Sequence, residues 1–487
     1  MVPAFDGLPG VFAIEAPVEF TLDATYFDTS DLALAARRLV LRRRRGGDDA
    51  GWHLKSPLGA GERQELREPL GNDAADIPER LLRSVRVHAR DSELIPVVRL
   101  QTRRTAYRLL GASGTVLAEF SDDRVRADRL VGEPHSESWR EWEVELVDGD
   151  PALLDAVQSM LATAGIQLAG YVSKFARALG DRHPRERPSA PSRPTRRSSA
   201  GQILLAYADE QVRVLWEQDP LVREDVPESV HEMRVALRRL RSALATFRVL
   251  IDAHSAQRLR EELKWVAGVL GAARDLEVLR QRLGDLISAE PPELVLGPVA
   301  RRIDEQLATS YRDAHLAAMT ALSSTRYFRL LDSLDSLLAE VPSTPLWSEP
   351  ARELVPGLIA REWKRMRTAI EAAERAPAGT PRDLALHEVR KSAKRLRYAA
   401  EAATWVHPKP ARRLAAAAAE VQTILGEHHD SVVSRGLLRR WAAEADLRGE
   451  SGFSYGRLDA LEQWHAAESD AQFARAWSRF PGPSLKV

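Results

Sequence analysis

Two segments of the chain carry the same arrangement of histidine and basic residues. HEMRVALRRLR at 231–241 and HEVRKSAKRLR at 387–397 share six of eleven residues and start 156 residues apart. A second matched pair follows them, because LGAARD ends at Asp275 and LGEHHD ends at Asp430. Two motifs that recur at preserved spacing predict an internal duplication. Arginine, lysine and histidine in such motifs are side chains that bind phosphate.

On a helix, the basic residues of each motif share one narrow face at 100° per residue. The two stripes are His231, Arg234, Arg238 and Arg241, and His387, Arg390, Lys394 and Arg397. The apolar side chains Met233, Leu240, Leu244 and Phe247 fall on another side and are expected in the core. Glu232 and Glu388 project away from the stripes, so the stacked cations repel unless an external anion or another helix neutralises them. This pattern favours an anion site over the alternative of a solvated charged face.

The histidines and aspartates of the motifs suit the same chemistry. As a neutral imidazole, His231 or His387 can donate one hydrogen bond to phosphate, and as a cation two. Either residue could instead lie in the core or cap a helix. Asp275 and Asp430 are expected to orient motif arginines rather than to act in acid–base catalysis. The adjacent histidines of GEHHD point about 100° apart, unlike the i,i+4 pair of helical zinc sites, so a metal is not expected there.

The whole-chain charge is balanced, with 70 Lys+Arg and 70 Asp+Glu, but 62 of the cations are arginine. Divided by region, the net charge is −5 over 1–180, +4 over 181–199 and +1 over 200–487, so a polyanion site must be local. The absence of cysteine excludes disulfides, thiolate metal sites and cysteine nucleophiles. No apolar run approaches the roughly 18 residues of a membrane span, and no secretory pattern opens the chain. We therefore expect a cytoplasmic protein without a membrane partner.

The pattern along the chain predicts an α+β protein of two domains. Residues 1–180 contain short alternating runs such as FTLDATYF and EWEVEL, which are typical of a mostly antiparallel β domain. Residues 181–199 are rich in proline and arginine and read as a linker. Residues 200–487 show helical periodicity and predict an all-α domain of two pseudo-symmetric bundles, with halves at about 200–345 and 346–487.

The duplicated half resembles a known family. VHEMRVALRRLRSAL with LGAARDLEVL, and LHEVRKSAKRLRYAAE with LGEHHDSVV, look like the two halves of a CHAD domain, the conserved histidine α-helical domain. The resemblance covers nearly all of 200–487. It implies a helical module that binds inorganic polyphosphate, without a cofactor, through basic faces that line a central groove. Carried over residue by residue, that role falls on His231, Arg234, Arg238, Arg239, Arg241, His387, Arg390, Lys394, Arg395 and Arg397.

The β-rich half also aligns charged residues on strand faces. Arg42 and Arg44 share one face, and Glu141, Glu143 and Glu145 share another. Inward carboxylates opposite inward arginines are costly to bury unless they enclose water, metal or phosphate. The alternative is an exposed charged ladder. Such a combination suits phosphoanhydride hydrolysis, in which carboxylates hold Mg²⁺ or Mn²⁺ and cations hold the phosphates.

Over about 19–180, this half is similar to the CYTH family of triphosphate tunnel enzymes. The matching pieces are TYFDTSDLALA, LRRRR, WHLK, RQELR, FSDDRV, EWEVEL and YVSKFARAL. The likeness implies an eight-stranded antiparallel tunnel barrel. It assigns phosphate contacts to Arg42, Arg44, Lys55, Arg63, Arg104 and Lys174. It assigns metal or acid–base roles to Glu65, Asp123, Glu143 and Glu145.

One part of the CYTH pattern has no match. The family opens with a strand reading ExExK, and nothing before Tyr26 corresponds to it, since Glu15 and Glu19 have the wrong spacing. Either the natural start lies upstream of Met1, or the barrel lacks its first strand and exposes an edge. We therefore expect a metal-dependent triphosphatase only as an alternative function, with Mg or Mn as its cofactor.

The leading expectation is polyphosphate binding by the helical domain, which would bring the protein to polyphosphate granules. In the enzyme alternative, the helical domain recruits substrate for the β domain. A further alternative is nucleic-acid binding, which needs aromatic residues interleaved with the basic ones for base stacking. Only Phe247 and Tyr398 flank the motifs, and neither lies on a stripe, so nucleic acid is the least favoured partner.

Overall fold

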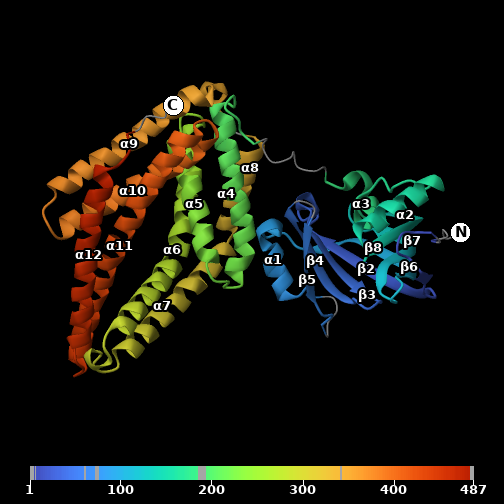
Figure 1. The fold of residues 1–487 in the computed structure, drawn as a ribbon, viewed down its shortest axis with the longest axis horizontal. Helices are drawn as coiled ribbons and strands as arrows, with labels where there is room; N and C mark the ends of the chain where they lie inside the picture. Colours follow the sequence, from blue (N-terminus) through green and yellow to red (C-terminus); the bar gives the residue numbers. More distant parts are fainter. Residues whose placement is uncertain are drawn as a thin grey trace. The chain divides into compact units, whose positions relative to one another are not determined.

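The chain forms two compact units in the computed structural model, Met1–Arg187 and Pro188–Val487. The structure describes residues 5, 7–59, 62–71, 76–184, 193–340 and 343–482, with the side chains of 58, 59, 62 and 63 left out. Figure 1 shows strands in the first unit and long helices in the second. The predicted β domain followed by a helical domain is confirmed. The predicted linker at 181–199 lies partly outside the described residues.

An antiparallel sheet makes up most of the first unit. Its strands are β1 (Ala13–Ile14), β2 (Val18–Asp28), β3 (Val40–Arg45), β4 (Gly51–Gly59), β5 (Glu62–Glu68), β6 (Ile95–Leu110), β7 (Val116–Arg129) and β8 (His135–Leu146). They are ordered β5-β4-β3-β2-β6-β7-β8, and β1 pairs with β6. Among the described strands, β5 and β8 form the two edges of the sheet, and no strand pairs with both of them to close it into a barrel. The closed tunnel that the CYTH resemblance implies is therefore corrected to an open antiparallel sheet.

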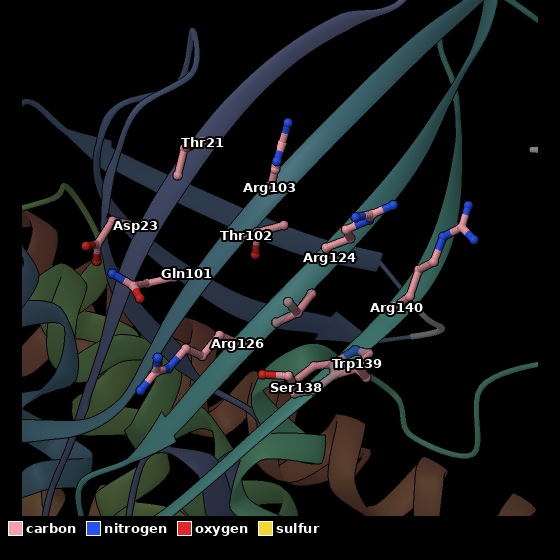
Figure 2. A pocket seen from close by; sticks show the side chains of 11 residues that line it. Thr21, Asp23, Gln101, Thr102, Arg103, Arg124, Arg126, Ser138, Trp139 and Arg140 are labelled. Carbon is pink, nitrogen blue, oxygen red and sulfur yellow. The ribbon is translucent and has the colours of Figure 1, made fainter.

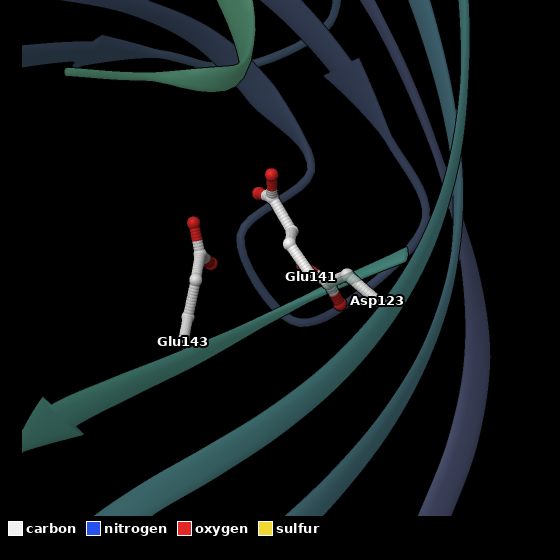
Figure 3. Close-up of side chains that lie close together, drawn as sticks. All are labelled: Asp123, Glu141 and Glu143. Carbon is white, nitrogen blue, oxygen red and sulfur yellow. The ribbon is translucent and has the colours of Figure 1, made fainter. Parts of the chain in front are cut away.

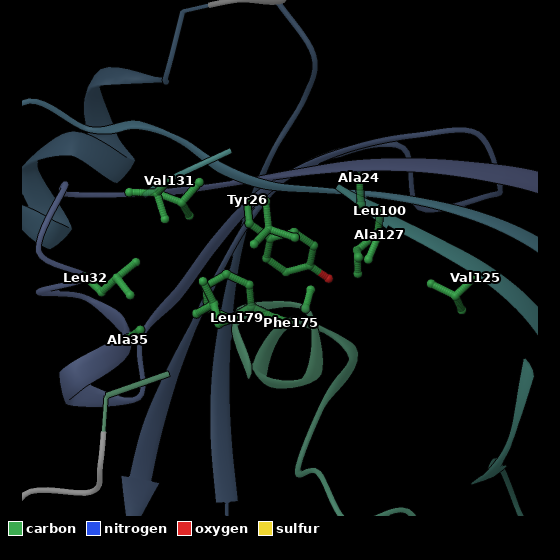
Figure 4. Packing of buried hydrophobic residues seen from close by; sticks show 13 residues of the cluster. Ala24, Tyr26, Leu32, Ala35, Leu100, Val125, Ala127, Val131, Phe175 and Leu179 are labelled. Atoms are coloured by element: carbon green, nitrogen blue, oxygen red, sulfur yellow. The ribbon is translucent and has the colours of Figure 1, made fainter. Parts of the chain in front are cut away.

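Three helices accompany the sheet: α1 (Glu79–Ala89), α2 (Pro151–Thr163) and α3 (Lys174–Leu179). Two short 3₁₀ turns, η1 (Ala35–Arg37) and η2 (Gly180–Arg182), complete the unit. The Ser173 side chain caps α3 by accepting a hydrogen bond from the Ala176 N–H at 3.1 Å. Phe175 and Leu179 then pack into a core on one face of the sheet, and the rings of Tyr26 and Phe175 stack 4.8 Å apart (Figure 4). This packing fixes the position of Lys174, the first residue of α3.

The second unit is entirely helical. Its helices are α4 (Ala200–Arg223), α5 (Ser229–Thr246), α6 (Ala253–Ala289), α7 (Val299–Leu322), α8 (Thr325–Ala339), α9 (Ala351–Arg375), α10 (Thr380–Ala402), α11 (Pro408–Leu447) and α12 (Phe453–Ser478). The short turns are η3 (Pro292–Leu294), η4 (Pro345–Ser348) and η5 (Ala403–Trp405). The motif helices α5 and α10 contact each other, and each packs on the long helix that follows it.

The long hairpins α6–α7 and α11–α12 share a hydrophobic core. Leu283 and Ile303 of the first hairpin cluster with Leu438 and Leu458 of the second. The two sequence repeats are thus joined at the motif helices and again along the hairpins. None of the described helices has the length and apolar character needed to cross a membrane.

Candidate functional site

The motif helices α5 and α10 separate their apolar and basic faces as the periodicity predicts. Met233, Leu240, Leu244 and Phe247 are all buried, with at most 1% of each residue exposed. In α10, Val389 and Leu396 are buried in the same way. The apolar side therefore holds each helix in the core, and the basic residues lie on the other side of the helix.

Four cations from the two repeats form a central basic cluster: Arg234 and Arg238 from α5, and Arg390 and Lys394 from α10. Burial, together with the charges of the three arginines, lowers the pKa of Lys394 to about 7. Burial also lowers the pKa of Arg238, helped by Arg234 and Arg390. The Nε atoms of the three arginines are buried and have no hydrogen-bond partner among the described residues. The cluster thus gathers partly buried positive charge that a bound anion would offset.

Two carboxylates border the central basic cluster. Asp275 accepts a hydrogen bond from Arg234 Nη1 at 3.0 Å, which agrees with the expected orienting role, and its side chain stays 75% exposed. Burial raises the pKa of Asp430, although the charge of Arg390 opposes that rise. Two carboxylates beside four cations leave the cluster with excess positive charge.

A glycine in each LGxxxD motif makes room for an arginine of the cluster. A Cβ atom at Gly271 would lie 3.2 Å from Arg234 Nη2, and one at Gly426 would lie 3.4 Å from Arg390 Nη2. Both guanidinium groups therefore rest directly against the following long helix. Neither glycine is among the predicted site residues, although their identical place in both motifs is a signal in the sequence.

The motif histidines lie at the edge of the cluster and are partly buried. Burial and the charge of Arg274 lower the pKa of His231. Burial and the charge of Arg390 lower the pKa of His387, whose buried Nδ1 has no partner among the described residues. The ring of His429 lies 4.3 Å from that of His387, and its pKa is lowered to about 4, first by burial. At neutral pH these imidazoles are neutral and each can donate one hydrogen bond.

The remaining predicted residues of the helical domain separate into two pairs. Arg239 and Arg397 meet at Glu401, with Nε to carboxylate distances of 3.3 Å and 2.8 Å. Arg241 and Arg395 lie near each other instead, and the charge of Arg395 contributes to the lowered pKa of Arg241 after burial. One pair is thus partly neutralised by Glu401, whereas the other pair lies in a positively charged environment.

In the β domain, three carboxylates converge on the inner face of the sheet. Asp123 of β7 and Glu141 and Glu143 of β8 have ligand oxygens within 4.8 Å of one another (Figure 3). We call these residues the carboxylate trio. Asp123 and Glu143 were predicted candidates, whereas the metal assignment missed Glu141. Carboxylate oxygens of this kind fit Mg²⁺ or Mn²⁺.

Two cations already neutralise part of the trio. Arg104 donates to both oxygens of Asp123 at 2.8 and 2.7 Å and to Glu143 at 2.6 Å. Lys174 Nζ lies 3.0 Å from Asp123 and 2.7 Å from Glu141, and it also contacts Glu143. Burial alone would lower the pKa of Lys174, but the charges of Glu143 and Asp123 outweigh it and raise that pKa. A metal at this place would share the carboxylates with Arg104 and Lys174.

A second group of predicted residues lies on β3, β4 and β5. Arg42 and Arg44 contact Asp49. Glu65 contacts Lys55 at 3.6 Å and also interacts with His53 and Arg67, and these partners outweigh burial and lower its pKa to about 2. Glu65 thus binds cations on β4 and β5 and does not join the trio. The remaining predicted residues are Glu145, which is exposed on β8, and Arg63, whose side chain lies outside the described part.

The opposite face of the sheet carries an open depression of about 620 Å³ (Figure 2). Arg103, Arg124, Arg126 and Arg140 line it, and they alternate along their strands with inner-face residues. Three of them have carboxylate partners, because Arg103 pairs with Glu19, Arg126 with Asp128 and Arg140 with Asp122. The arginines that line this depression are therefore largely ion-paired, and the depression lies on the face of the sheet away from the trio.

Each of the two units matches a known protein family. Residues 10–179 match the family model of the CYTH domain, and residues 206–439 match that of the CHAD domain. The uncharacterized proteins MT2285 and Rv2226 from two strains of Mycobacterium tuberculosis are each 40% identical to this chain. Each alignment spans 472 residues and covers 94% of this chain and 89% of the relative.

Two solved structures also align with the chain. PptA from Streptomyces chartreusis is 23% identical with a TM-score of 0.49, and it aligns with 59% of this chain and over its own full length. The CHAD domain from the plant Ricinus communis is 26% identical with a TM-score of 0.48, covering 61% of this chain and 100% of that domain.

Proposed function

The chain belongs to the family of proteins that join a CYTH domain to a CHAD domain, and we propose that it binds inorganic polyphosphate through the central basic cluster. One observation carries this proposal. Both repeats place partly buried cations together, with guanidinium Nε atoms that have no partner among the described residues. Such an arrangement is destabilising by itself and is relieved when an anion binds. Binding to long chains would also recruit the protein to polyphosphate granules.

The aromatic residues beside the motifs favour polyphosphate over nucleic acid. Base stacking requires exposed rings next to the cations. Phe247 and Tyr398 are buried, with 1% and 3% of each residue exposed, so neither can stack on a base. The cluster offers hydrogen-bond donors and positive charge, which an inorganic phosphate chain can use fully.

Competition between long-chain polyphosphate and single-stranded RNA tests the proposal. At matched phosphate concentration, polyphosphate should displace RNA from the full-length protein, with an affinity that falls steeply as salt rises. Isothermal titration calorimetry or fluorescence anisotropy gives both affinities. RNA binding that matches or exceeds polyphosphate binding would contradict the proposal.

The depressed pKa of Lys394 predicts a pH-dependent affinity. In the free protein this group loses its proton above about pH 7, and a bound polyanion would raise its pKa again. Binding should therefore take up about one proton between pH 7 and pH 9, and log K should fall by up to about one per pH unit. Titrations in buffers of different ionisation enthalpy measure the uptake.

Lys394→Arg is the matched variant, because arginine stays charged throughout this range. Its affinity should be nearly constant between pH 7 and pH 9. The same variant leaves proton uptake by His387 and His429 at lower pH in place, since both imidazoles have lowered pKa values. An unchanged pH profile in Lys394→Arg would assign the titration to another group.

The carboxylate trio favours a second candidate function, a metal-dependent triphosphatase. Mg²⁺ or Mn²⁺ held by Asp123, Glu141 and Glu143 would polarise a phosphoryl group and position water. Arg104 and Lys174 stand beside the trio and could hold phosphate oxygens. Phosphate release from tripolyphosphate with each metal tests this function, with Glu143→Gln as the control. Equal release by both proteins would show that the trio plays no part.

A further inference from the structure

The basic stripes of α5 and α10 end differently. In α10, Glu401 stands one turn beyond Arg397, on the same side of the helix. The corresponding position in α5, after Arg241, is Ala245. The two repeats thus differ at the end of the stripe: Glu401 closes the stripe of the second repeat, and Ala245 stands at the matching position of the first.

Glu401 pairs with one arginine from each motif helix. Its carboxylate lies 2.8 Å from Arg397 Nε and 3.3 Å from Arg239 Nε, and it accepts a hydrogen bond from Tyr207 at 3.3 Å. The ring of Tyr398 lies beside both guanidinium groups, 5.9 Å from Arg239 and 5.7 Å from Arg397. The Glu401 carboxylate and the Tyr398 ring already engage these two arginines, and the Tyr207 phenol donates to the carboxylate.

At the other end, three arginines lie near one another. Arg241 of α5, Arg395 of α10 and Arg260 of α6 interact electrostatically, and we call them the distal basic cluster. Among the described residues, no carboxylate lies within ion-pair distance of any of the three. Arg260 donates to Gln257 Oε1 at 2.9 Å, and its buried Nε has no partner there. This end thus shares two features with the central basic cluster: neighbouring cations and a buried guanidinium Nε without a partner among the described residues.

Resting on the proposed polyphosphate function, we propose that a bound chain runs from the central basic cluster onto the distal basic cluster and not toward Glu401. Arg238 and Arg241 are three residues apart on one stripe, about 4.5 Å along the helix axis, so the two clusters are continuous. The proposal adds Arg260 to the binding surface and removes Arg239 and Arg397 from it. It also makes the surface one-sided, although the fold is duplicated.

Ala245→Glu in the full-length protein tests the direction of the chain. The new carboxylate would pair with Arg241 as Glu401 pairs with Arg397, so long-chain polyphosphate should bind about tenfold more weakly at physiological salt. The slope of log K against log salt should become smaller by about one to two. Tripolyphosphate, which is short enough for the central basic cluster alone, should change by less than about twofold. Ala467→Glu on the exposed side of α12 adds the same charge and should change neither affinity.

Two further variants keep the test decisive if Ala245→Glu fails to fold. Arg260→Gln should weaken long-chain binding alone, and Glu401→Gln should leave it equal or strengthen it. Long-chain affinity that is unchanged in Ala245→Glu and Arg260→Gln, or weakened in Glu401→Gln, would overturn the one-sided surface. Failure of the wild-type protein to bind polyphosphate at all would instead overturn the proposed function.

Discussion

Replacing Arg238 with glutamine and Lys394 with methionine should abolish most polyphosphate binding while making the free protein more stable. Each residue is a partly buried cation with a lowered pKa and no hydrogen-bonded carboxylate among the described residues. Two lost charge-assisted contacts weaken binding by about 3–6 kcal/mol, or roughly two to four orders of magnitude. Calorimetry with long-chain polyphosphate measures this loss.

The gain in stability has the same physical origin. Burial and neighbouring cations penalise the charged form of Lys394, and a methionine of similar length removes that penalty. A gain on the order of 2 kcal/mol is expected, which raises Tm by several degrees. A fall in affinity together with a rise in stability distinguishes a binding site from a structural network, because substitutions in a structural network lower both affinity and stability.

The control for this variant removes the same charge elsewhere. Arg301→Gln with Arg312→Gln on the exposed side of α7 also loses two positive charges. Its polyphosphate affinity should stay close to that of the wild-type protein, and its Tm should not rise. A double variant Arg238→Gln/Lys394→Met that keeps its affinity, or loses stability, would contradict the assignment of the central basic cluster.

The sequence predicts the stripes because helical periodicity alone decides which residues share a face. Met233 and Leu240 are buried where the period places them, and the charges of Arg234 and Arg238 act on Lys394 of the partner helix. Periodicity within a helix gives no information on which helices pack together. Arg260 of α6 therefore could not be joined to Arg241 and Arg395 from the sequence.

The ion pair between Arg397 and Glu401 could have been predicted from the sequence. Glu401 lies four residues after Arg397, which is the spacing of an ion pair on one helix, and that pair forms. Its second partner, Arg239, comes from the other repeat and depends on how α5 packs against α10. Local spacing thus predicts one contact, and tertiary packing adds the other.

The carboxylate trio shows the same limit for strands. Alternation places Glu141, Glu143 and Glu145 on one face, but only the first two reach the trio. The third member, Asp123, comes from β7 through the register of Asp123 against Glu141. Arg104 reaches the trio through the pairing of β6 with β7, in which Arg104 lies opposite Asp123. Strand pairing therefore decides which of the predicted acids meet.

Replacing Arg282 with methionine should cause a large loss of stability without a direct effect on the binding surface. Arg282 of α6 binds Glu462 of α12 through Nε at 2.7 Å and Nη2 at 2.8 Å, and it also reaches Glu427 at 2.6 Å and Ser431 at 2.9 Å, both of α11. Glu462 is fully buried, and the bonds from Arg282 outweigh that burial and lower its pKa. Removing Arg282 takes away the cation bonded to this buried carboxylate and leaves the Ser431 hydroxyl, which donates to it at 2.8 Å, as a neutral partner. The expected cost is about 3–5 kcal/mol.

The double variant Arg282→Met/Glu462→Met tests whether the loss of stability comes from the charge that the single variant leaves uncompensated. With both charges gone, apolar side chains fill the buried space between α6 and α12, and much of the lost stability should return. Chemical denaturation of the single and double variants measures the coupling energy between the two residues. A loss that is the same in both would show that Arg282 acts through its packing, whereas recovery would show that the loss in the single variant comes from the uncompensated charge of Glu462.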